Sequence, residues 1–196
     1  MKKGLIIILI AILTFGGIII LTKTSAFKWQ RFLWLKSKTS IQQTQTHDSD
    51  GDGKNEDYIL QNGKIKILQN GQTLWQSPPE WWVDSFAVAD SDNNSQQELN
   101  LSVWKIGSFG PIKPFWFIGK DDGISNHFFV FRLVRGDFNP VWQSSALTRP
   151  NCSFEFKTQN NQTLLYTREG QYTSDYSCTP LSESIWEWNG WGFAKK

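Results

Sequence analysis

Residues 47–60 read H-D-S-D-G-D-G-K-N-E-D-Y-I-L, and this stretch decides how we interpret the rest of the chain. Asp48, Asp50 and Asp52 stand at alternate positions, a glycine follows, and Glu56 comes three residues after that glycine. Carboxylates crowded into one turn repel each other unless a cation lies among them. Calcium takes about six to eight oxygen ligands at about 2.3–2.6 Å and tolerates the irregular geometry of a loop. The stretch therefore predicts a loop that binds Ca2+ through these four side chains.

The backbone supplies two further features that such a loop needs. Gly53 permits a sharp turn because it has no Cβ, and the carbonyl oxygen of Lys54 is a fifth candidate ligand. The loop is not an EF-hand, because Ile59 holds the position of the final EF-hand glutamate and a strand-like sequence follows in place of a helix. The alternative interpretation is a solvated acidic turn without a metal ion.

A similar loop recurs 42 residues further along, where the chain reads D-S-D-N-N-S-Q-Q-E-L-N-L from residue 90. We expect weaker calcium binding here, because an amide replaces one carboxylate and Ser95 replaces the turn glycine. The candidate ligands of this second loop are Asp90, Asp92, Asn94, the carbonyl oxygen of Gln96, and Glu98.

A third, decayed copy is the interpretation we give to residues 155–166, E-F-K-T-Q-N-N-Q-T-L-L-Y. Its lysine stands where the second ligand belongs and should exclude a cation. A period of about 40 residues with strand-like sequence is typical of a solenoid or a propeller. The residues in the ligand positions of this copy are Glu155, Lys157, Gln159 and Thr163.

Loops of the form D-x-D-x-D-G-x-x-[DE], followed by an apolar strand, a Gly-led strand and a Trp-ended strand, resemble FG-GAP or VCBS-type β-propeller repeats. In the first repeat the matching segments are D-S-D-G-D-G-K-N-E-D-Y-I-L, N-G-K-I-K-I-L and N-G-Q-T-L-W-Q-S. The second repeat matches with a long insertion and the third in outline, so the resemblance covers roughly residues 40–193. It implies blades braced by calcium and a binding or adhesive role outside the cytoplasm. It implies no particular ligand.

Turn chemistry divides the first unit, residues 40–79, into a four-stranded meander. Asn62-Gly63 and Asn70-Gly71 are strong hairpin signals, and Pro78-Pro79 closes the unit because proline donates no ladder hydrogen bond. The strands of this unit are expected at about 41–47, 57–61, 64–69 and 72–77. Two more units, residues 82–148 and 150–194, have strands expected at 82–89, 99–105, 127–134, 141–144, 163–167, 184–188 and 191–193.

These units predict an all-β fold over residues 40–196. We expect a partial or small β-propeller-like array of about three four-stranded antiparallel blades, preceded by one N-terminal transmembrane helix. Three units leave two open faces. We expect the chain to cover them itself, with the insertion at residues 107–126, the aromatic residues 27–35 and the Trp-rich C-terminus. The alternatives are a homo-oligomer or a larger partner that completes the ring.

Residues 5–21 form an almost unbroken apolar run of 17 residues after Lys2 and Lys3. This length lies at the short end for a spanning helix. The alternative is a cleaved signal peptide, for which Thr24-Ser25-Ala26 offers a small residue. We favour an uncleaved membrane anchor within residues 1–26, because signal-peptide cores are usually shorter. The basic residues that follow do not favour an exported C-terminus, but the calcium loops and cysteines do. We therefore expect a single-pass cell-membrane protein with an extracytoplasmic C-terminal domain.

Two aromatic stretches are candidates for contacts outside the domain. Residues 27–39 begin F-K-W-Q-R-F-L-W-L-K-S-K and either lie at the level of lipid headgroups or form a strand or helix packed on the domain. The long insertion at residues 107–126 is of a length that is usually functional. In it, Phe115, Trp116 and Phe117 either form a platform for a ligand or cover the open end of a blade.

Cys152 and Cys178 are the only cysteines of the chain. In an exported protein an even pair predicts a disulfide bond. A zinc site would need more ligands than these two and the distant His47 and His127.

The chain has no G-x-S-x-G or H-E-x-x-H motif and only two histidines, so we do not expect an enzyme. Its net charge is +2 and no cluster of Lys and Arg occurs in the globular part, which argues against nucleic acid as a partner. The prediction is a membrane-anchored, calcium-stabilised module that binds an unknown protein or carbohydrate. The alternatives are a structural accessory domain of an envelope complex and, less favoured, a carbohydrate-active hydrolase.

Overall fold

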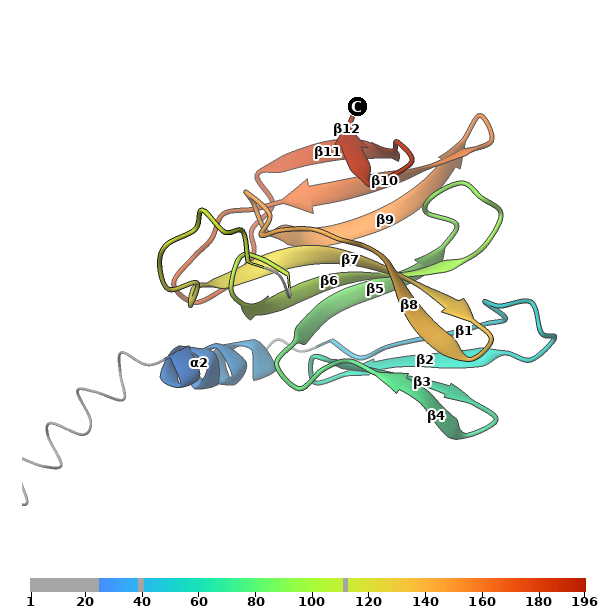
Figure 1. Ribbon diagram of the computed structural model, residues 1–196, viewed down its shortest axis with the longest axis horizontal. Helices are drawn as coiled ribbons and strands as arrows, with labels where there is room; N and C mark the ends of the chain where they lie inside the picture. The colour runs from blue at the N-terminus through green and yellow to red at the C-terminus, as the bar shows by residue number, and fades with distance from the viewer. Residues whose placement is uncertain (1–24, 39–40, 111–112) are drawn as a thin grey trace, which may run out of the picture.

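A computed structural model describes residues 25–38, 41–110 and 113–196. The described chain contains one helix, α2 (Ser25–Ser37), and twelve strands in three four-stranded sheets (Figure 1). Every strand pairing is antiparallel, so the predicted all-β fold of four-stranded antiparallel sheets is confirmed. The apolar run of the predicted membrane anchor, residues 5–21, lies outside the described residues. Within the described residues, no helix is long and apolar enough to cross a bilayer.

The first sheet is the meander that the turn signals predict. Its strands are β1 (Gln43–His47), β2 (Glu56–Gln61), β3 (Lys64–Gln69) and β4 (Gln72–Gln76), in that order across the sheet. Both Asn-Gly pairs adopt positive φ, at 50° and 69° for Asn62 and Gly63, as a tight hairpin turn requires. Gly63 has a second role, because a Cβ there would lie 2.2 Å from the Trp82 ring. The turn thus sets the distance between the first sheet and the next.

The central sheet contains β5 (Trp82–Ala89), β6 (Glu98–Ile106), β7 (Ile124–Val134) and β8 (Asp137–Gln143), again in sequence order. β8 starts four residues earlier than predicted and runs through Pro140. The strand tolerates this proline because β8 is an edge strand and the register with β7 shifts between Val130 and Phe131. The β7–β8 hairpin turns at Arg135 and Gly136, both with positive φ.

The third sheet contains β9 (Asn151–Gln159), β10 (Gln162–Glu169), β11 (Ser182–Trp188) and β12 (Phe193–Lys195). The structure contradicts our interpretation of residues 155–166 as a decayed metal loop. Glu155, Lys157 and Gln159 lie within β9, and Thr163 lies in β10. Only Asn160 and Asn161 separate the strands, with φ of 51° and 61°. The paired asparagines form a two-residue hairpin turn, which is too short to gather ligands.

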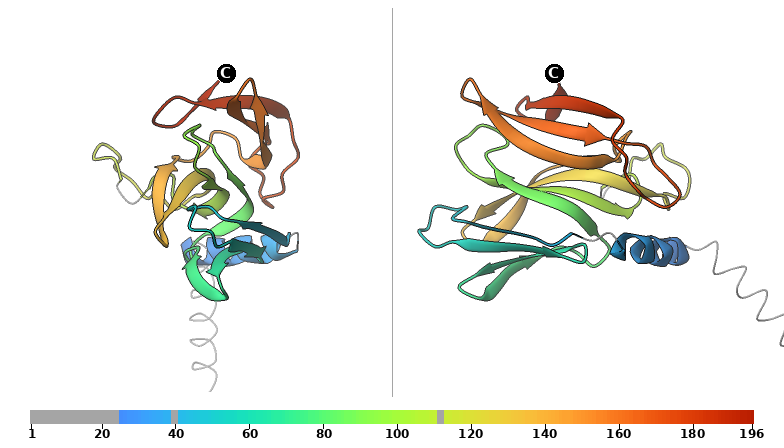
Figure 2. Two further views of the ribbon diagram at one scale, coloured as in Figure 1. Left: turned by 90° about the vertical axis from the view of Figure 1, so that its right-hand side faces the viewer. Right: turned by 180° about the vertical axis from the view of Figure 1, so that it is seen from behind.

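The three sheets stack face to face, with the central sheet between the other two (Figures 1 and 2). Because strand side chains alternate between faces, β7 presents Phe129 and Phe131 to the first sheet and Phe128 and Val130 to the third. A strand buried on both faces needs apolar residues at consecutive positions, which explains the unbroken F-F-V-F in β7. The hydrophobic core is therefore two layers, one on each side of the central sheet.

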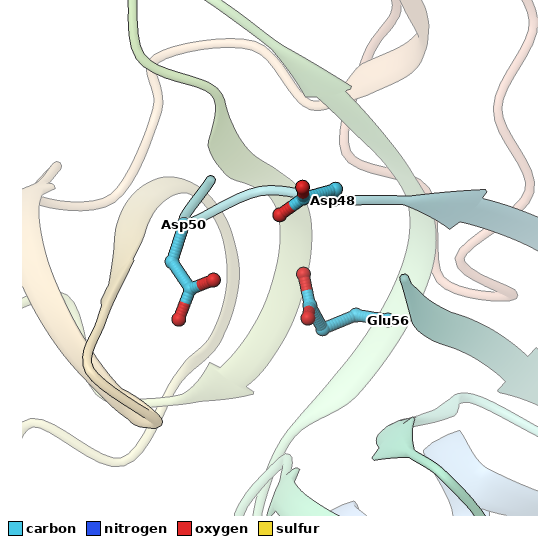
Figure 3. A group of neighbouring side chains, drawn as sticks. All are labelled: Asp48, Asp50 and Glu56. Atoms are coloured by element: carbon cyan, nitrogen blue, oxygen red, sulfur yellow. The ribbon is translucent and has the colours of Figure 1, made fainter. Parts of the chain in front are cut away.

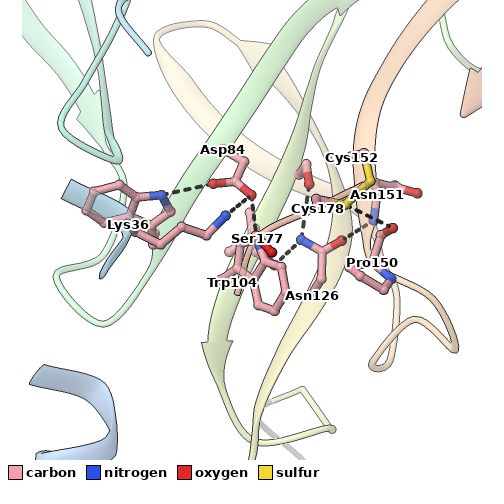
Figure 4. A network of polar contacts seen from close by, with 12 residues as sticks. Lys36, Asp84, Trp104, Asn126, Pro150, Asn151, Cys152, Ser177 and Cys178 are labelled. Carbon is pink, nitrogen blue, oxygen red and sulfur yellow. Dashed lines mark hydrogen bonds and ion pairs between the residues drawn. A yellow bond between two sulfur atoms is a disulfide. The ribbon is translucent and has the colours of Figure 1, made fainter. Parts of the chain in front are cut away.

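Helix α2 packs on one end of the central sheet, so for residues 25–37 the packed-helix interpretation is the correct one. Phe32 is fully buried against Trp82 and Trp104. Asp84 accepts hydrogen bonds from the indole nitrogens of Trp82 at 3.0 Å and Trp104 at 2.5 Å. It also forms an ion pair with Lys36 Nζ at 2.7 Å (Figure 4). One carboxylate thus joins the helix to two strands of the central sheet.

The predicted disulfide is confirmed. Cys152 in β9 is bonded to Cys178 in the segment before β11, with Cα atoms 5.2 Å apart (Figure 4). A Cβ at Gly170 would lie 2.8 and 2.9 Å from the two sulfur atoms, so this position needs a glycine. The bond fastens the long β10–β11 connection to the third sheet.

Candidate metal centre

The first carboxylate loop, residues 48–55, connects β1 and β2. These strands pair with His47 opposite Glu56, so their ends bring Asp48 next to Glu56. Each of Asp48, Asp50 and Glu56 places a carboxylate oxygen within 4.8 Å of the others. Figure 3 shows Asp48 and Glu56 at the ends of the two strands, with Asp50 on the loop beside them. The predicted ligands Asp48, Asp50 and Glu56 are therefore brought together.

Backbone amides fix the orientation of the aspartates in this loop. Gly51 and Gly53 donate to the two oxygens of Asp48 at 2.8 and 3.0 Å, and the Asp52 amide donates to Asp50 at 3.2 Å. Gly51 and Gly53 have φ of 72° and 83°, which glycine adopts without strain. The sequence indicated Gly53 as a turn residue, and the structure adds Gly51.

Glu56 is the buried member of the group, with no exposed surface. Its carboxylate accepts from the Ser49 amide at 2.8 Å and from Gln69 Nε2 at 2.9 Å. Burial raises the pKa of Glu56, the two hydrogen bonds oppose this, and the charges of Asp50 and Asp48 add to the rise. Within the described residues, no cationic side chain lies within ion-pair distance of Asp48, Asp50 or Glu56. In the described part of the chain, these three carboxylates thus concentrate negative charge without a cationic side chain paired to any of them.

The remaining predicted ligand side chain, Asp52, lies next to this group of three, and Gln69 bridges it to Glu56. Asp52 accepts from the Lys54 amide at 2.8 Å and from Lys54 Nζ and Gln69 Nε2, both at 3.3 Å. The hydrogen bond from the Lys54 amide lowers the pKa of Asp52 despite partial desolvation. Asp52 therefore borders the group of three carboxylates without belonging to it.

The second carboxylate loop, residues 90–97, connects β5 and β6 in the same way, with Ala89 opposite Glu98. Asp90, Asp92 and Glu98 each place an oxygen within 4.8 Å of the others. The amides of Asn94 and Ser95 donate to the two oxygens of Asp90, both at 2.9 Å. The predicted ligand Asn94 lies beside this group, since its Nδ2 donates to Asp92 at 3.1 Å and its Oδ1 accepts from the Gln96 amide at 2.8 Å.

Arg132, which the sequence analysis missed, enters the second group from β7. Its guanidinium pairs with Asp92 Oδ2 at 2.5 Å and with Glu98 Oε1 at 2.9 Å. Glu98 has no exposed surface and also accepts from Ser91. Burial raises the pKa of Glu98 overall, although the Ser91 amide and Arg132 lower it. No local sequence pattern points to Arg132, because it lies 34 positions after Glu98 in the chain. Only the pairing of β6 with β7 places it beside that glutamate.

The aromatic insertion is fastened at its base and exposed at its tip. Asp121 accepts from the Ser108 amide at 2.7 Å. Burial raises the pKa of Asp121, but the hydrogen bonds from Ser108 and Phe109 and the charge of Lys105 together lower it. Phe115 is 93% exposed and Trp116 is 69% exposed, whereas Phe117 contacts Phe109. The prediction that this segment covers an open sheet face is wrong at the tip, since these rings point away from the core.

The C-terminal tryptophans divide between core and surface. Trp186 packs into the layer between the third and central sheets, and Trp188 contacts Phe193 in the same region. Trp191 is 75% exposed. Trp186 thus lies between two sheets and not over an open face, and Trp191 is exposed, so the predicted covering role is wrong for both.

Comparison with protein-family models, with curated proteins and with solved structures finds no match to this chain. The fold and the site nevertheless define a class: an all-β protein of three face-packed antiparallel sheets, two of which carry a carboxylate-rich loop between their first and second strands. Both loops lie at the end of the molecule opposite α2 (Figures 1 and 2).

Proposed function

We propose that this protein is a membrane-anchored, extracytoplasmic binding module whose β-propeller-like domain is braced by calcium. The observation that carries the calcium proposal is the convergence of Asp48, Asp50 and Glu56 without a cationic side chain between them. The donors are all hard oxygens, which suit calcium or magnesium, and the loop backbone suits the more adaptable coordination of calcium. Bound calcium would neutralise the buried Glu56 carboxylate and hold the ends of β1 and β2 together.

Three stacked four-stranded sheets support the β-propeller-like assignment. In a propeller, successive blades pack face to face, as the first, central and third sheets do here. Two of the sheets carry their acidic loop at the same place, between their first and second strands. We infer from this arrangement, with the sequence resemblance, that the sheets are related to the blades of FG-GAP or VCBS-type repeats.

The extracytoplasmic location is supported by the disulfide between Cys152 and Cys178, because such bonds persist in oxidising compartments. The apolar sequence of residues 5–21, which ends shortly before α2, supports the anchor. A direct test expresses the full chain in cells and asks whether an external protease reaches the domain in intact cells. Digestion only after the cells are opened would refute the proposed orientation.

For the ligand, we propose the exposed tip of the aromatic insertion, Phe115, Trp116 and Phe117, as the contact surface. Exposed rings of this kind are enriched at protein interfaces and stack on sugars. The base of the insertion is joined to α2 by the pair Lys28–Asp122 at 3.2 Å. The tip therefore lies at the α2 end of the molecule (Figure 1), which favours a protein or carbohydrate presented close to the membrane.

The calcium proposal is tested by thermal unfolding of the full-length chain in detergent micelles. Free calcium at about ten times the Kd should raise the free energy of unfolding by about 1.4 kcal/mol, which is a Tm rise of about 3–5 °C for a domain of this size. Asp50→Asn should remove most of this rise, whereas the exposed Asp57→Asn should leave it unchanged. An equal rise in wild type and Asp50→Asn would refute the site.

A further inference from the structure

We propose that only the first carboxylate loop takes a metal ion, and that the Arg132 guanidinium is the resident cation of the second loop. This inference rests on the proposed function, because it concerns which of two acidic loops the calcium occupies. The two loops share their strand geometry and their buried glutamate, yet they compensate negative charge in different ways.

The strand register shows that Arg132 and Gln69 are equivalent. Glu56 in β2 pairs with Gln69 in β3, and Glu98 in β6 pairs with Arg132 in β7. Each partner therefore stands beside the buried glutamate of its own loop, on the next strand of the sheet. The same position holds a neutral amide in one sheet and a fixed positive charge in the other.

The two partners reach different carboxylates. Gln69 donates to Glu56 and to Asp52, which lies outside the first group of three carboxylates. Arg132 binds Glu98 and Asp92, which are two of the three gathered in the second loop. The guanidinium therefore uses one oxygen of each of these two carboxylates, Asp92 Oδ2 and Glu98 Oε1, and it repels a divalent cation at the same place. The other oxygen of Asp92, Oδ1, is buried without a hydrogen-bond partner among the described residues. With Asp90, these groups sum to a net charge of −2, against −3 for the first group alone.

A second observation shows that protein contacts already brace the second loop. The Asn93 side chain accepts from the Thr163 amide at 2.6 Å and donates to the Thr163 carbonyl at 3.2 Å, which ties this loop to β10 of the third sheet. The corresponding position in the first loop is Gly51, which has no side chain to make such a tie. The first loop thus lacks the tie to a neighbouring sheet that the second loop has.

The test is the number of calcium ions bound per chain, measured by equilibrium dialysis of the full-length protein in detergent micelles. Free calcium spans about 0.01–10 mM, which covers the affinities typical of extracellular modules. Wild type should bind one ion. Arg132→Gln should bind two, and it should gain thermal stability from calcium that Arg132→Lys, the charge-preserving control, does not gain.

The reciprocal variant completes the design. Gln69→Arg should weaken binding at the first loop at least about 100-fold, because it places a unit charge within about 4 Å of the ion. The double exchange Gln69→Arg with Arg132→Gln should again bind one ion, now at the second loop. Adding Asp92→Asn to the double exchange should abolish this binding. Circular dichroism of each variant shows whether it is folded. If Arg132→Gln is unfolded without calcium, the inference predicts that added calcium restores its fold.

Each outcome bears on a separate claim. Two ions in both wild type and Arg132→Gln would overturn the inference and leave the calcium proposal intact. No ion in wild type but one in Arg132→Gln would support the role of Arg132 and refute the first-loop site. No ion in any variant would refute both.

Discussion

Replacing Phe32 with alanine should release α2 from the central sheet. The Phe32 ring has no exposed surface and lies 4.7 Å from Trp29, 5.8 Å from Trp104 and 4.9 Å from Tyr176, measured between ring centroids. Removing a ring of this kind from a closed aromatic cluster costs about 3–5 kcal/mol, through lost burial and the cavity that remains. For a domain of this size the loss corresponds to a Tm lower by about 6–20 °C.

The matched control is Trp34→Ala on the same helix. Trp34 is 59% exposed and its ring contacts the neighbouring Lys38, so its removal should cost about 1 kcal/mol or less. Urea denaturation of the full-length chain in micelles, followed by tryptophan fluorescence, gives both free energies of unfolding. Equal losses for the two variants would refute the conclusion that α2 is part of the folded domain.

Two further predictions concern the disulfide and a buried histidine. Cys152→Ala with Cys178→Ala should lower the free energy of unfolding by about 3–4 kcal/mol, because the bond closes a loop of 26 residues; an unchanged urea midpoint would contradict this. His127 is fully buried between Ser125, Ser144 and Gly107, and burial with the nearby Lys105 charge lowers its pKa to about 4, although Asp121 opposes this. In the unfolded chain the pKa of histidine is about 6.5. Neutral His127 therefore contributes its full stability above that pH, and the free energy of unfolding falls by up to about 3 kcal/mol as the pH drops towards about 4. The pH dependence of unfolding should therefore flatten in this window in His127→Gln, and identical curves would refute the assignment.

Sequence patterns were sufficient for the strands and for the ligands closest in sequence. The Asn-Gly turns gave the first sheet to within two residues, because these pairs favour the positive φ that a tight hairpin requires. The loop at Asp48 was predicted because its ligands are local. The repeat spacing misled us at residues 155–166, where Asn160 and Asn161 form a left-handed hairpin turn of the kind that asparagine tolerates.

The rest of the site depends on register and packing, which local patterns do not encode. Arg132 and Gln69 contact the carboxylates only because two hairpins set them opposite Glu98 and Glu56. Similarly, nothing local distinguishes Phe32, which is buried, from Trp34, which is exposed two positions later on the same helix. Both cases require knowledge of which strand or sheet lies beside the residue.

The most direct test of the central claim is a crystal structure of the full-length chain grown with calcium, with the ion located by anomalous scattering. The account predicts one ion bound to Asp48, Asp50 and Glu56, with oxygen distances of about 2.3–2.6 Å, and the Arg132 guanidinium still between Asp92 and Glu98. An ion at the second loop, or none at the first in calcium that saturates the thermal shift, would contradict it.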